Sequence, residues 1–363
     1  MKLSQFKYTF FVVCILVFFN QNLLAQSTPK YSNEFLSIGV GARSFGMANS
    51  VVASVDDVTA GYWNPSGLIN QKEKLQISFM HSNYFSGIAN YDYLGISTQV
   101  NEKSALSFSM VRFGVDNIPN TLDLIRNGQI NYDRITSFSS VDYGFFVSYA
   151  QKALKNGLSF GGSAKIVHRQ AGDFASSWGF GVDMSSRYES KNNWTFALLA
   201  RDITTTFNAW SYDFTAAEEE IFLQTNNEIP QNSIELTLPK FIFGVAKKMN
   251  FNNKFSLLAE MNLDVNTDGK RNTLLKSDLL SGDPHLGLEC GYKEIVFLRA
   301  GVGNIQQQMD LNFSDQWTFM PNIGVGVKFK QVVLDYALSD IGDQSAAQYS
   351  HVFSVRASIN PTP

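Results

Sequence analysis

Cysteine is almost absent from this sequence, which excludes several kinds of site at once. Only Cys14 and Cys290 occur among 363 residues. Cys14 lies in an N-terminal segment that we expect to be removed on export, so Cys290 remains alone and neither an intramolecular disulfide nor a cysteine metal site can form. We interpret Cys290 as a single buried or lipid-facing thiol without special reactivity.

Long apolar runs are also lacking after the first 25 residues, which excludes a helical inner-membrane protein. Residues 1–25 have the form of a secretory signal peptide: Lys2 and Lys7 precede an apolar stretch that is too short to span a membrane, and Leu24-Ala25-Gln26 fits a cleavage point. The mature protein is therefore expected in the periplasm or in the outer membrane.

Charged residues are scarce as well, at 17% of the chain against roughly 25% in typical soluble domains, whereas aromatic residues make up 13%. The chain has 29 basic and 32 acidic residues, and loss of Lys2 and Lys7 leaves 27 basic residues and a net charge of −5. This acidic balance argues against a nucleic-acid partner. The apolar surplus requires either a large core or contact with lipid.

Apolar residues alternate with small or polar residues through most of the chain, which is the period of a β-strand with one wet face. The pattern is clear in 106–110, 158–166 and 323–329. Most alternating segments have about nine to eleven residues, the length that a tilted strand needs to cross a bilayer. We predict fourteen strands, near residues 75–81, 89–99, 104–112, 140–150, 157–168, 176–186, 194–202, 239–247, 254–263, 284–292, 294–303, 320–329, 331–339 and 350–360.

The predicted links between strands alternate in length, which is typical of an up-and-down barrel of a bacterial outer membrane. Every second link is tight, and longer links are expected at 113–139, 169–175, 203–238, 264–283, 304–319 and 340–349. An even strand number places both termini on the periplasmic side and leaves the long loops extracellular. The predicted fold is all-β: a fourteen-stranded antiparallel transmembrane β-barrel formed by residues 73–363, whose closure removes unpaired edges.

Residues 26–72, between the signal peptide and the first strand, do not alternate over the length of a strand and are rich in small residues. Asn64-Pro65-Ser66-Gly67 has the composition of a turn that leads into the barrel wall. We predict that this segment forms an N-terminal plug inside the lumen. Inward glycines of the wall would leave room for it: Gly161, Gly179, Gly181, Gly324 and Gly326.

The plug segment carries a motif that resembles a known family. The run from Gly41-Ala42-Arg43 through Asp56-Asp57 to Trp63-Asn64-Pro65-Ser66-Gly67-Leu68 is similar to the start of PorV/PorQ outer-membrane barrels, which are related to the long-chain fatty acid (FadL-like) transporters. Ser66 stands where the transporter motif has alanine. The segment 264–275 also resembles PorV-like proteins. The chain departs from the usual barrel pattern at its end, where Asn360-Pro361-Thr362-Pro363 replaces a terminal aromatic residue.

The resemblance implies a barrel that serves the type IX secretion system of Bacteroidetes-type bacteria. As an accessory or cargo-shuttle component, it would bind the C-terminal sorting domains of exported proteins that leave the secretion translocon. The alternative is a FadL-like channel for the uptake of hydrophobic small molecules, with an apolar pocket in the lumen and a lateral exit. A purely structural or assembly barrel is a third possibility.

Asp56 and Asp57 are adjacent acids in an otherwise small and apolar plug, where a buried charge needs partners. We expect a structural clamp that holds the plug, and a role in gating or ligand contact is the alternative. The candidate partners are the inward cations Lys165, Arg201, Arg299, Lys328 and Arg356.

Asp264, Asn266 and Asp268 occupy alternate positions like the first half of a calcium loop. Leu275 stands where such a loop needs a bidentate glutamate, so a polar surface loop is the expected interpretation and a calcium site the weaker alternative.

The long predicted loop 203–238 combines three successive glutamates with aromatic and aliphatic residues, which are favoured in protein interfaces. A lid folded over the barrel mouth is the alternative for this loop and for the loop 113–139, with Leu122, Leu124 and Ile125. The candidates for binding a protein partner are Trp210, Tyr212, Phe214, Ile221 and Phe222.

No catalytic constellation stands out in the sequence. The four histidines fall on separate predicted strands or at their ends, and none has metal-ligand spacing to another histidine or to a carboxylate: His81, His168, His285 and His351. We expect no enzymatic activity and no cofactor. The expected partners are outer-membrane lipid and the secretion proteins, or a hydrophobic small molecule in the alternative.

Overall fold

The structure is a computed structural model that describes residues 32–84, 87–126, 128–154, 157–252, 254–309, 314–339 and 349–359. The predicted signal peptide, residues 26–31 and the chain end from Asn360 lie outside these residues. Among the described residues, no helix is long and apolar enough to cross a membrane.

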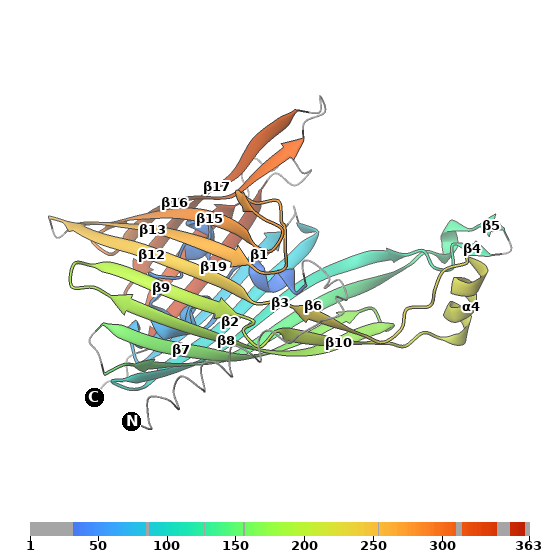
Figure 1. Cartoon of the computed structure of the whole chain (residues 1–363), viewed down its shortest axis with the longest axis horizontal. Helices are drawn as coiled ribbons and strands as arrows, with labels where there is room; N and C mark the ends of the chain where they lie inside the picture. The colour runs from blue at the N-terminus through green and yellow to red at the C-terminus, as the bar shows by residue number, and fades with distance from the viewer. Residues whose placement is uncertain are drawn as a thin grey trace, which may run out of the picture. The chain divides into compact units, whose positions relative to one another are not determined.

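Long antiparallel strands make up most of the described chain (Figure 1). They are β1 (Leu75–Tyr84), β2 (Ala89–Asn101), β3 (Ser104–Asn120), β6 (Thr136–Lys152), β7 (Leu158–Ala171), β8 (Ala175–Glu189), β9 (Trp194–Arg201), β10 (Thr206–Tyr212), β11 (Ser233–Thr237), β12 (Lys240–Phe251), β13 (Phe255–Asn266), β15 (Ser281–Tyr292), β16 (Val296–Met309), β17 (Asp315–Phe329), β18 (Val332–Ser339) and β19 (Ser350–Ile359). Three short strands accompany them: β4 (Ile125–Arg126), β5 (Gln129–Ile130) and β14 (Leu275–Lys276).

The long strands close into one barrel, because β1 pairs with both β2 and β19. β9 and β10 share one place in the wall, since they pair with opposite halves of β8. β11 and β12 share the next place, with β11 on β10 and β12 on β9. The wall therefore has fourteen strand positions, as predicted.

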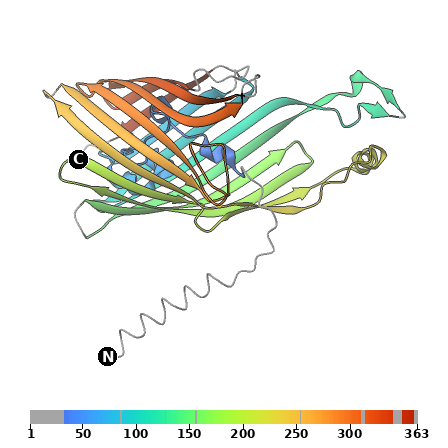
Figure 2. The same cartoon turned by 45° about the horizontal axis from the view of Figure 1, so that its top comes forward.

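The two ends of the barrel differ, as Figure 2 makes plain. At the short-turn end lie the tight links that follow β2, β6, β8, β12, β15 and β17, together with the start of β1 and the end of β19. At the long-loop end, strands extend beyond the barrel. Three predicted links were wrong in extent. The links 113–139 and 304–319 are largely paired ribbon, because β3 runs to Asn120 and β16 to Met309. The link 203–238 contains β10 and β11, which pair with each other and continue the wall. The link at 169–175 is a tight turn instead, since β7 ends at Ala171 and β8 begins at Ala175.

The outer face of the wall is apolar and ends in aromatic side chains. On β8, Trp178, Met184 and Tyr188 are exposed, while the alternate residues Asp183 and Arg187 are buried inside. Ten residues separate Trp178 from Tyr188, which corresponds to an apolar band about 25 Å tall for a strand tilted by about 40°. This height matches the hydrocarbon layer that a barrel of this kind must cross.

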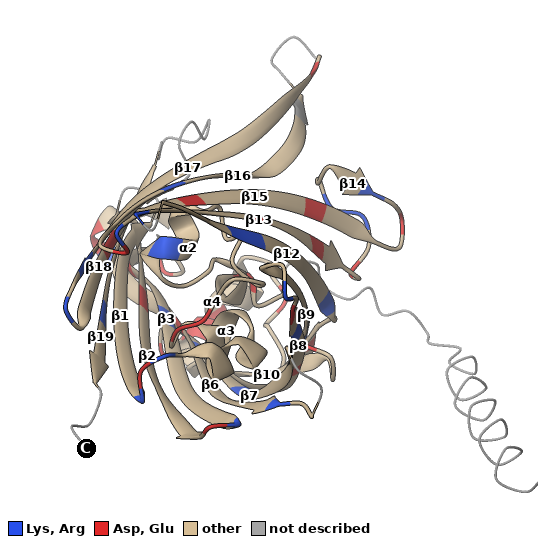
Figure 3. Ribbon diagram, turned by 90° about the vertical axis from the view of Figure 1, so that its left-hand side faces the viewer, with Lys and Arg blue, Asp and Glu red and all other residues tan. Residues whose placement is uncertain are grey.

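The N-terminal segment Ser32–Asn70 folds inside the barrel, and we call it the plug. It contains the short helices η1 (Glu34–Ser37), α2 (Ala42–Gly46), α3 (Ala60–Trp63) and η2 (Pro65–Asn70). In Figure 3, which looks at the short-turn end, α2 and α3 lie within the ring of strands. Its buried residues, such as Val40 and Leu68, join inward wall residues, such as Tyr91 and Leu199, in one apolar cluster. The core of this protein is thus the contact between plug and wall.

Glycines of the wall allow the plug backbone to approach closely. A Cβ atom added to Gly301 would lie 2.3 Å from the carbonyl carbon of Met47, and one added to Gly161 would lie 2.3 Å from the amide nitrogen of Ser66. A Cβ atom added to Gly324 would lie 3.0 Å from the Cα of Gly46. The other predicted glycines make room for wall side chains instead: Gly179 for Asn208, Gly181 for Thr206 and Gly326 for Asp335.

We predict that Gly301→Ala lowers the temperature at which the folded barrel is lost, because overpacking a close contact costs about 1–3 kcal/mol. Folded and unfolded forms would be separated by gel mobility after heating in detergent. Gly162→Ala is the matched control, since its Cβ would meet only the Asp183 carbonyl oxygen, at 3.3 Å. Equal unfolding temperatures for the two variants would contradict tight packing of the plug at Gly301.

Candidate functional site: the plug and the cavity beside it

An ion network joins the plug to the wall near α2. The Arg43 guanidinium donates to both carboxylate oxygens of Glu289 on β15, with Nε 2.9 Å from Oε2 and Nη2 3.3 Å from Oε1. Arg299 on β16 donates to the same Glu289 at 2.7 Å and to Asp335 on β18 at 2.7 Å. The plug is thereby tied to three neighbouring strands through alternating charges.

The electrostatics of this network favour the charged form of Arg43. Burial disfavours the guanidinium charge, but the Glu289 carboxylate and its hydrogen bonds outweigh this effect and hold the pKa of Arg43 above its usual range. Arg43 therefore stays a cation throughout the physiological pH range.

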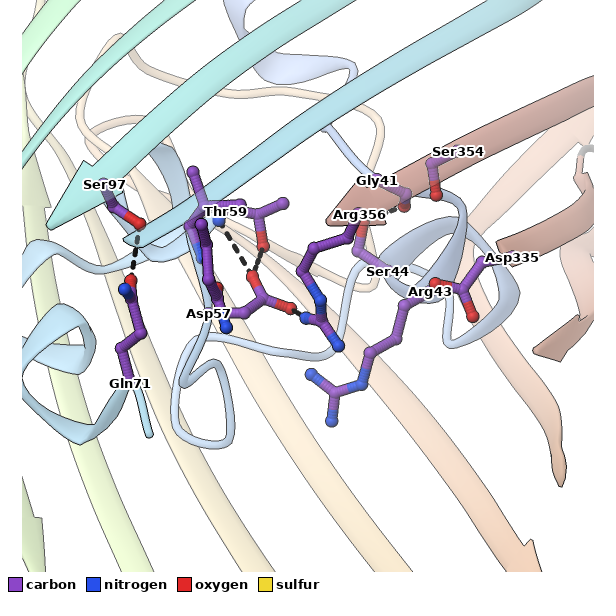
Figure 4. Close-up of polar contacts among 12 residues, drawn as sticks. Gly41, Arg43, Ser44, Asp57, Thr59, Gln71, Ser97, Asp335, Ser354 and Arg356 are labelled. Atoms are coloured by element: carbon purple, nitrogen blue, oxygen red, sulfur yellow. Dashed lines mark hydrogen bonds and ion pairs between the residues drawn. The ribbon is translucent and has the colours of Figure 1, made fainter. Parts of the chain in front are cut away.

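Asp57 forms a second clamp between plug and wall (Figure 4). One carboxylate oxygen accepts from the Thr59 backbone amide at 2.8 Å, and the other accepts from Arg356 on β19. The neighbouring Asp56 is exposed to solvent. The adjacent acids thus have different environments, and only Asp57 is buried.

Most of the cations that we considered as partners for the two acids bind elsewhere. Lys165 bridges Asp183 at 2.8 Å and Asp202 at 2.6 Å inside the wall. Arg201 donates to the plug carbonyls of Leu36 at 3.0 Å and Tyr62 at 3.1 Å. Arg299 belongs to the Glu289 network. Lys328 is exposed at the short-turn end.

The residues of the plug motif fix the plug's own conformation. Trp63 donates from Nε1 to the Val40 carbonyl at 2.8 Å, and the Asn64 side chain donates to the Val52 carbonyl at 2.7 Å. The Asn64 side chain also accepts from the Ser66 amide at 3.1 Å, which caps η2, with Pro65 in its first turn. Gly67 is required because a Cβ there would lie 2.4 Å from the Val55 carbonyl oxygen. The contacts of this motif thus stabilise the fold of the plug itself.

A polar cavity of about 350 Å³ lies between the plug and the long-loop end. Its lining includes Glu34 of η1, Arg201 of the wall and Arg271 of the loop after β13. On one side, Lys240 pairs with Asp264 at 2.6 Å. On the other, Arg271 bridges Asp268 and Glu34, and these acids hold its pKa above the usual range although burial acts against the charge.

Several polar atoms at this cavity are buried without a hydrogen bond in the described part of the chain. They are His285 Nε2, Asp283 Oδ1 and Asn49 Oδ1. His285 Nε2 lies 3.7 Å from Asp264 and 3.8 Å from Asp283, which is too far for a hydrogen bond to either. Since an unsatisfied buried polar group costs free energy, the cavity is suited to water or to a polar ligand.

The three residues of the calcium-like segment point to different partners. Asp264 binds Lys240, Asp268 binds Arg271, and Asn266 is buried at the end of β13. Across the described residues, no group of three or more His, Cys, Asp or Glu side chains converges as a metal site would require. The carboxylates of Asp264 and Asp268 are thus already paired with basic residues.

Besides the ribbon formed by the outer parts of β16 and β17, two ribbons project from the long-loop end, and we call these two the arms. The first arm consists of the outer parts of β3 and β6 with β4 and β5 at its tip; the second consists of β10 and β11 with α4 (Ala216–Gln224) between them. Both extend beyond the barrel in Figures 1 and 2. A Thr215 and Glu218 capping box begins α4.

The predicted partner residues of loop 203–238 line the second arm. Trp210, Tyr212 and Phe214 stack in succession, with ring centroids 6.3 Å and 6.2 Å apart. Phe214 meets Phe222 of α4 at 5.1 Å. Phe174 continues this aromatic ladder towards the first arm, at 5.8 Å from Phe214. Ile221, also on α4, is half-buried. These residues form an extended apolar surface rather than a lid over the lumen.

Sequence reasoning missed the cavity residues Glu34, Arg271 and His285. The only available signal was the proximity of Arg271 to Asp268 in the chain, since Glu34 is 237 residues away from Arg271. Of the other histidines, His81 pairs with Asp92 at 2.7 Å, His168 stacks on Trp178, and His351 bonds Tyr336. Cys290 is exposed on the outer face of β15.

We predict that Glu289→Gln destabilises the plug by about 3 kcal/mol, because it leaves the buried Arg43 without a carboxylate partner, while Arg299 keeps Asp335. The readout is cleavage of the plug by an added protease in the folded barrel, followed over time. Glu294→Gln, which removes the exposed pair with Lys248 at 3.5 Å, is the matched control and should leave the plug as resistant as in the wild type. Equal rates of plug cleavage in the two variants would contradict a role of Glu289 in holding the plug.

Several solved structures share this fold. The CymD monoaromatic hydrocarbon channel is 14% identical and superposes with a TM-score of 0.56 over 89% of this chain and 98% of its own. The Ralstonia pickettii toluene transporter TbuX is 14% identical and superposes with a TM-score of 0.55 over 89% of this chain and 99% of its own. A Pseudomonas aeruginosa FadL homologue is 12% identical and superposes with a TM-score of 0.52 over 88% of this chain and 98% of its own. These likenesses establish a FadL-like barrel fold. No sequence among curated proteins matches the chain.

The sequence itself matches one protein family over more than half of its length. The family profile described as type IX secretion system protein PorV aligns with residues 21–232, which include the plug and the wall as far as β10, as well as α4. The resemblance noted around Asp56-Asp57 and Trp63-Asn64-Pro65 is therefore confirmed. This chain belongs to the PorV family of type IX secretion proteins and is an outer-membrane β-barrel with a FadL-like fold.

Proposed function

We propose that this protein is an accessory, cargo-handling component of type IX protein secretion, and that it binds the C-terminal sorting domains of exported proteins at its long-loop end. The role is one of binding, without catalysis and without a cofactor. Family membership supports the secretion role in general, and the surface of the arms supports the binding of a protein.

The exposed apolar surface of the arms is the main observation that supports this proposal. Large apolar side chains stand exposed on them, including Ile130 at 58%, Tyr132 at 72% and Leu223 at 69% exposure. The tips of the arms, which carry these three residues, lie beyond the level of Trp178 and therefore beyond the apolar band that faces lipid. A contiguous apolar and aromatic surface in water favours contact with a protein.

The interior supports a protein partner over a hydrophobic solute. The cavity is lined by ion pairs such as Lys240 with Asp264, and a hydrocarbon would have to leave these groups without solvent. Below the cavity, the plug is held by the Glu289 and Asp57 clamps. The alternative, a channel for hydrophobic small molecules, is favoured by the fold likeness to hydrocarbon transporters.

The proposed orientation places the short-turn end, with the start of β1 and the end of β19, in the periplasm and the arms outside the cell. The asymmetry of the links supports it, because barrels of the outer membrane have short periplasmic turns and longer outer loops. The partners in this arrangement are the secretion translocon and the sorting domains that it releases.

We predict that replacing the apolar residues of α4 by serine, as Ile221→Ser, Phe222→Ser and Leu223→Ser, lowers retention of a purified sorting domain by the immobilised barrel at least about tenfold. Leu279→Ser with Leu280→Ser is the matched control, because these residues are exposed at the same end in another loop. Unchanged retention in the α4 variant would contradict binding through the second arm.

We further predict that titration of the purified barrel with toluene or palmitate gives no saturable heat of binding, because the cavity lining is charged. The same protein extracted from outer membranes in mild detergent should retain translocon or sorting-domain proteins, identified by mass spectrometry. Saturable binding of either lipophile, with no protein retained, would favour hydrophobic uptake instead.

A further inference from the structure

The short-turn end of the barrel is strongly basic. We define the short-turn rim as residues 72–74, 101–104, 151–154, 188–194, 247–252, 254, 292–295 and 328–331. Four acidic residues lie on it: Glu73, Glu102, Glu189 and Glu294. Its lysines outnumber them almost threefold: Lys72, Lys74, Lys103, Lys152, Lys191, Lys247, Lys248, Lys254, Lys293, Lys328 and Lys330. Figure 3 looks at this end and shows the basic positions distributed around the ring of turns.

The long-loop end has the opposite sign, although the chain as a whole is nearly balanced in charge. Its exposed acids include Asp116, Asp133, Asp173, Asp213, Glu219, Glu220, Glu228, Asp278 and Asp315. An excess of lysine at one end is therefore a local property of the rim and does not follow from the overall composition.

Aromatic side chains mark the depth of the rim in the membrane. A ring of exposed aromatic residues lies just inside the turns: Tyr149, Phe160, Tyr188, Trp194, Phe251, Phe255, Tyr292 and Phe329. Such rings lie at the level of the lipid headgroups. The lysines of the adjoining turns are consequently at headgroup height.

Three rim lysines stand directly on these lipid-facing rings. The ammonium nitrogen lies 5.0 Å from the ring centroid for Lys247 over Trp194, 5.3 Å for Lys293 over Tyr292 and 5.6 Å for Lys330 over Phe329. Among the described residues, no carboxylate lies within ion-pair distance of Lys293 or Lys330, whereas Lys248 pairs with Glu294. The Lys247 ammonium also donates to the Asn192 carbonyl of the turn between β8 and β9. Each of the three ammonium groups thus lies over an aromatic ring at the outer surface of the wall, facing the headgroups.

We propose that the short-turn rim binds the phosphate groups of anionic phospholipids in the adjoining leaflet, with Lys247, Lys293 and Lys330 as the contacting groups. Each lysine extends its chain along an aromatic ring and donates to a lipid phosphate. The proposal requires insertion in a membrane but is independent of the secretion role.

The placement of the lysines favours lipid over a soluble acidic protein. The three lie at different places around the rim: Lys247 on β12 beside Trp194 of β9, Lys293 in the turn between β15 and β16, and Lys330 in the turn between β17 and β18. Each stands over an aromatic ring of the outer face of the wall. A folded protein would need to surround the barrel at the depth of the headgroups to reach all three. A leaflet of phospholipid meets this geometry without rearrangement.

The test uses Trp194 as a probe of the lipid beside the rim. In the full-length barrel, Trp178→Phe, Trp210→Phe and Trp317→Phe leave Trp194 and the plug residue Trp63, which is buried in the lumen. The variant is reconstituted at pH 8 in phosphatidylcholine mixed with brominated phosphatidylglycerol or brominated phosphatidylcholine. Quenching of tryptophan fluorescence then gives the relative affinity of the two lipids.

We expect phosphatidylglycerol to be preferred at Trp194 by about fivefold for each lysine in contact, because a lysine near an anionic surface contributes about 1 kcal/mol. Lys247→Gln with Lys293→Gln and Lys330→Gln should abolish the preference, as should high salt, and arginine at the three positions should restore it. Gel mobility confirms folding of each variant.

A probe at the other end is the matched control. Trp178, which stacks on His168 at 4.2 Å, is retained in place of Trp194, and no preference for phosphatidylglycerol is expected there. Equal quenching by both lipids at Trp194, or the same preference at Trp178, would overturn the proposal. Either result would leave retention of sorting domains by the arms unaffected, so the two proposals fail separately.

Discussion

Inside a bilayer, every N–H and C=O group of the wall must find its partner within the protein, because hydrocarbon offers none. Here the pairing of β1 with β19 closes the sheet. Closure at fourteen positions fixes the width of the lumen, which is too large for wall side chains alone to fill. The plug occupies this space, and glycines such as Gly301 allow its backbone to approach the wall. The plug is therefore a consequence of the barrel's circumference as much as of its own sequence.

The same constraint explains where the charges lie. Lipid excludes them from most of the outer face, so ionic residues of the strands turn inwards, where they need partners of opposite sign. Arg43, Glu289, Arg299 and Asp335 satisfy one another in this way. Farther towards the arms, the pairs of Lys240 and Arg271 line a cavity that remains polar. The interior that results is suited to water or to a polar ligand.

Alternation of residue type was sufficient to locate all fourteen wall positions, because each strand has one face in lipid and one in a small or polar lumen. The motif around Trp63 and Asn64 indicated the plug and its family. Partners within the site could not be predicted, since contacts such as Arg271 with Glu34 join parts of the chain that no local pattern relates. The regions 113–139 and 203–238 were predicted as long outer loops, but the paired strands within them were missed, because the alternating pattern does not show where a strand continues beyond the lipid.

The clamps of the plug have a consequence for the order of assembly. Glu289 follows Arg43 by 246 residues, and Arg356 follows Asp57 by 299, so these two ionic clamps of the plug require strands from the last part of the chain. Contacts of such separation form late, because the entropy of closing the intervening loop must first be overcome. Earlier strands such as β6 and β9 already offer hydrogen bonds to the plug, whereas the two ionic clamps form only after most of the wall is present. Pairing of β19 with β1 then closes the barrel and, in the same step, brings Arg356 to Asp57 of the plug.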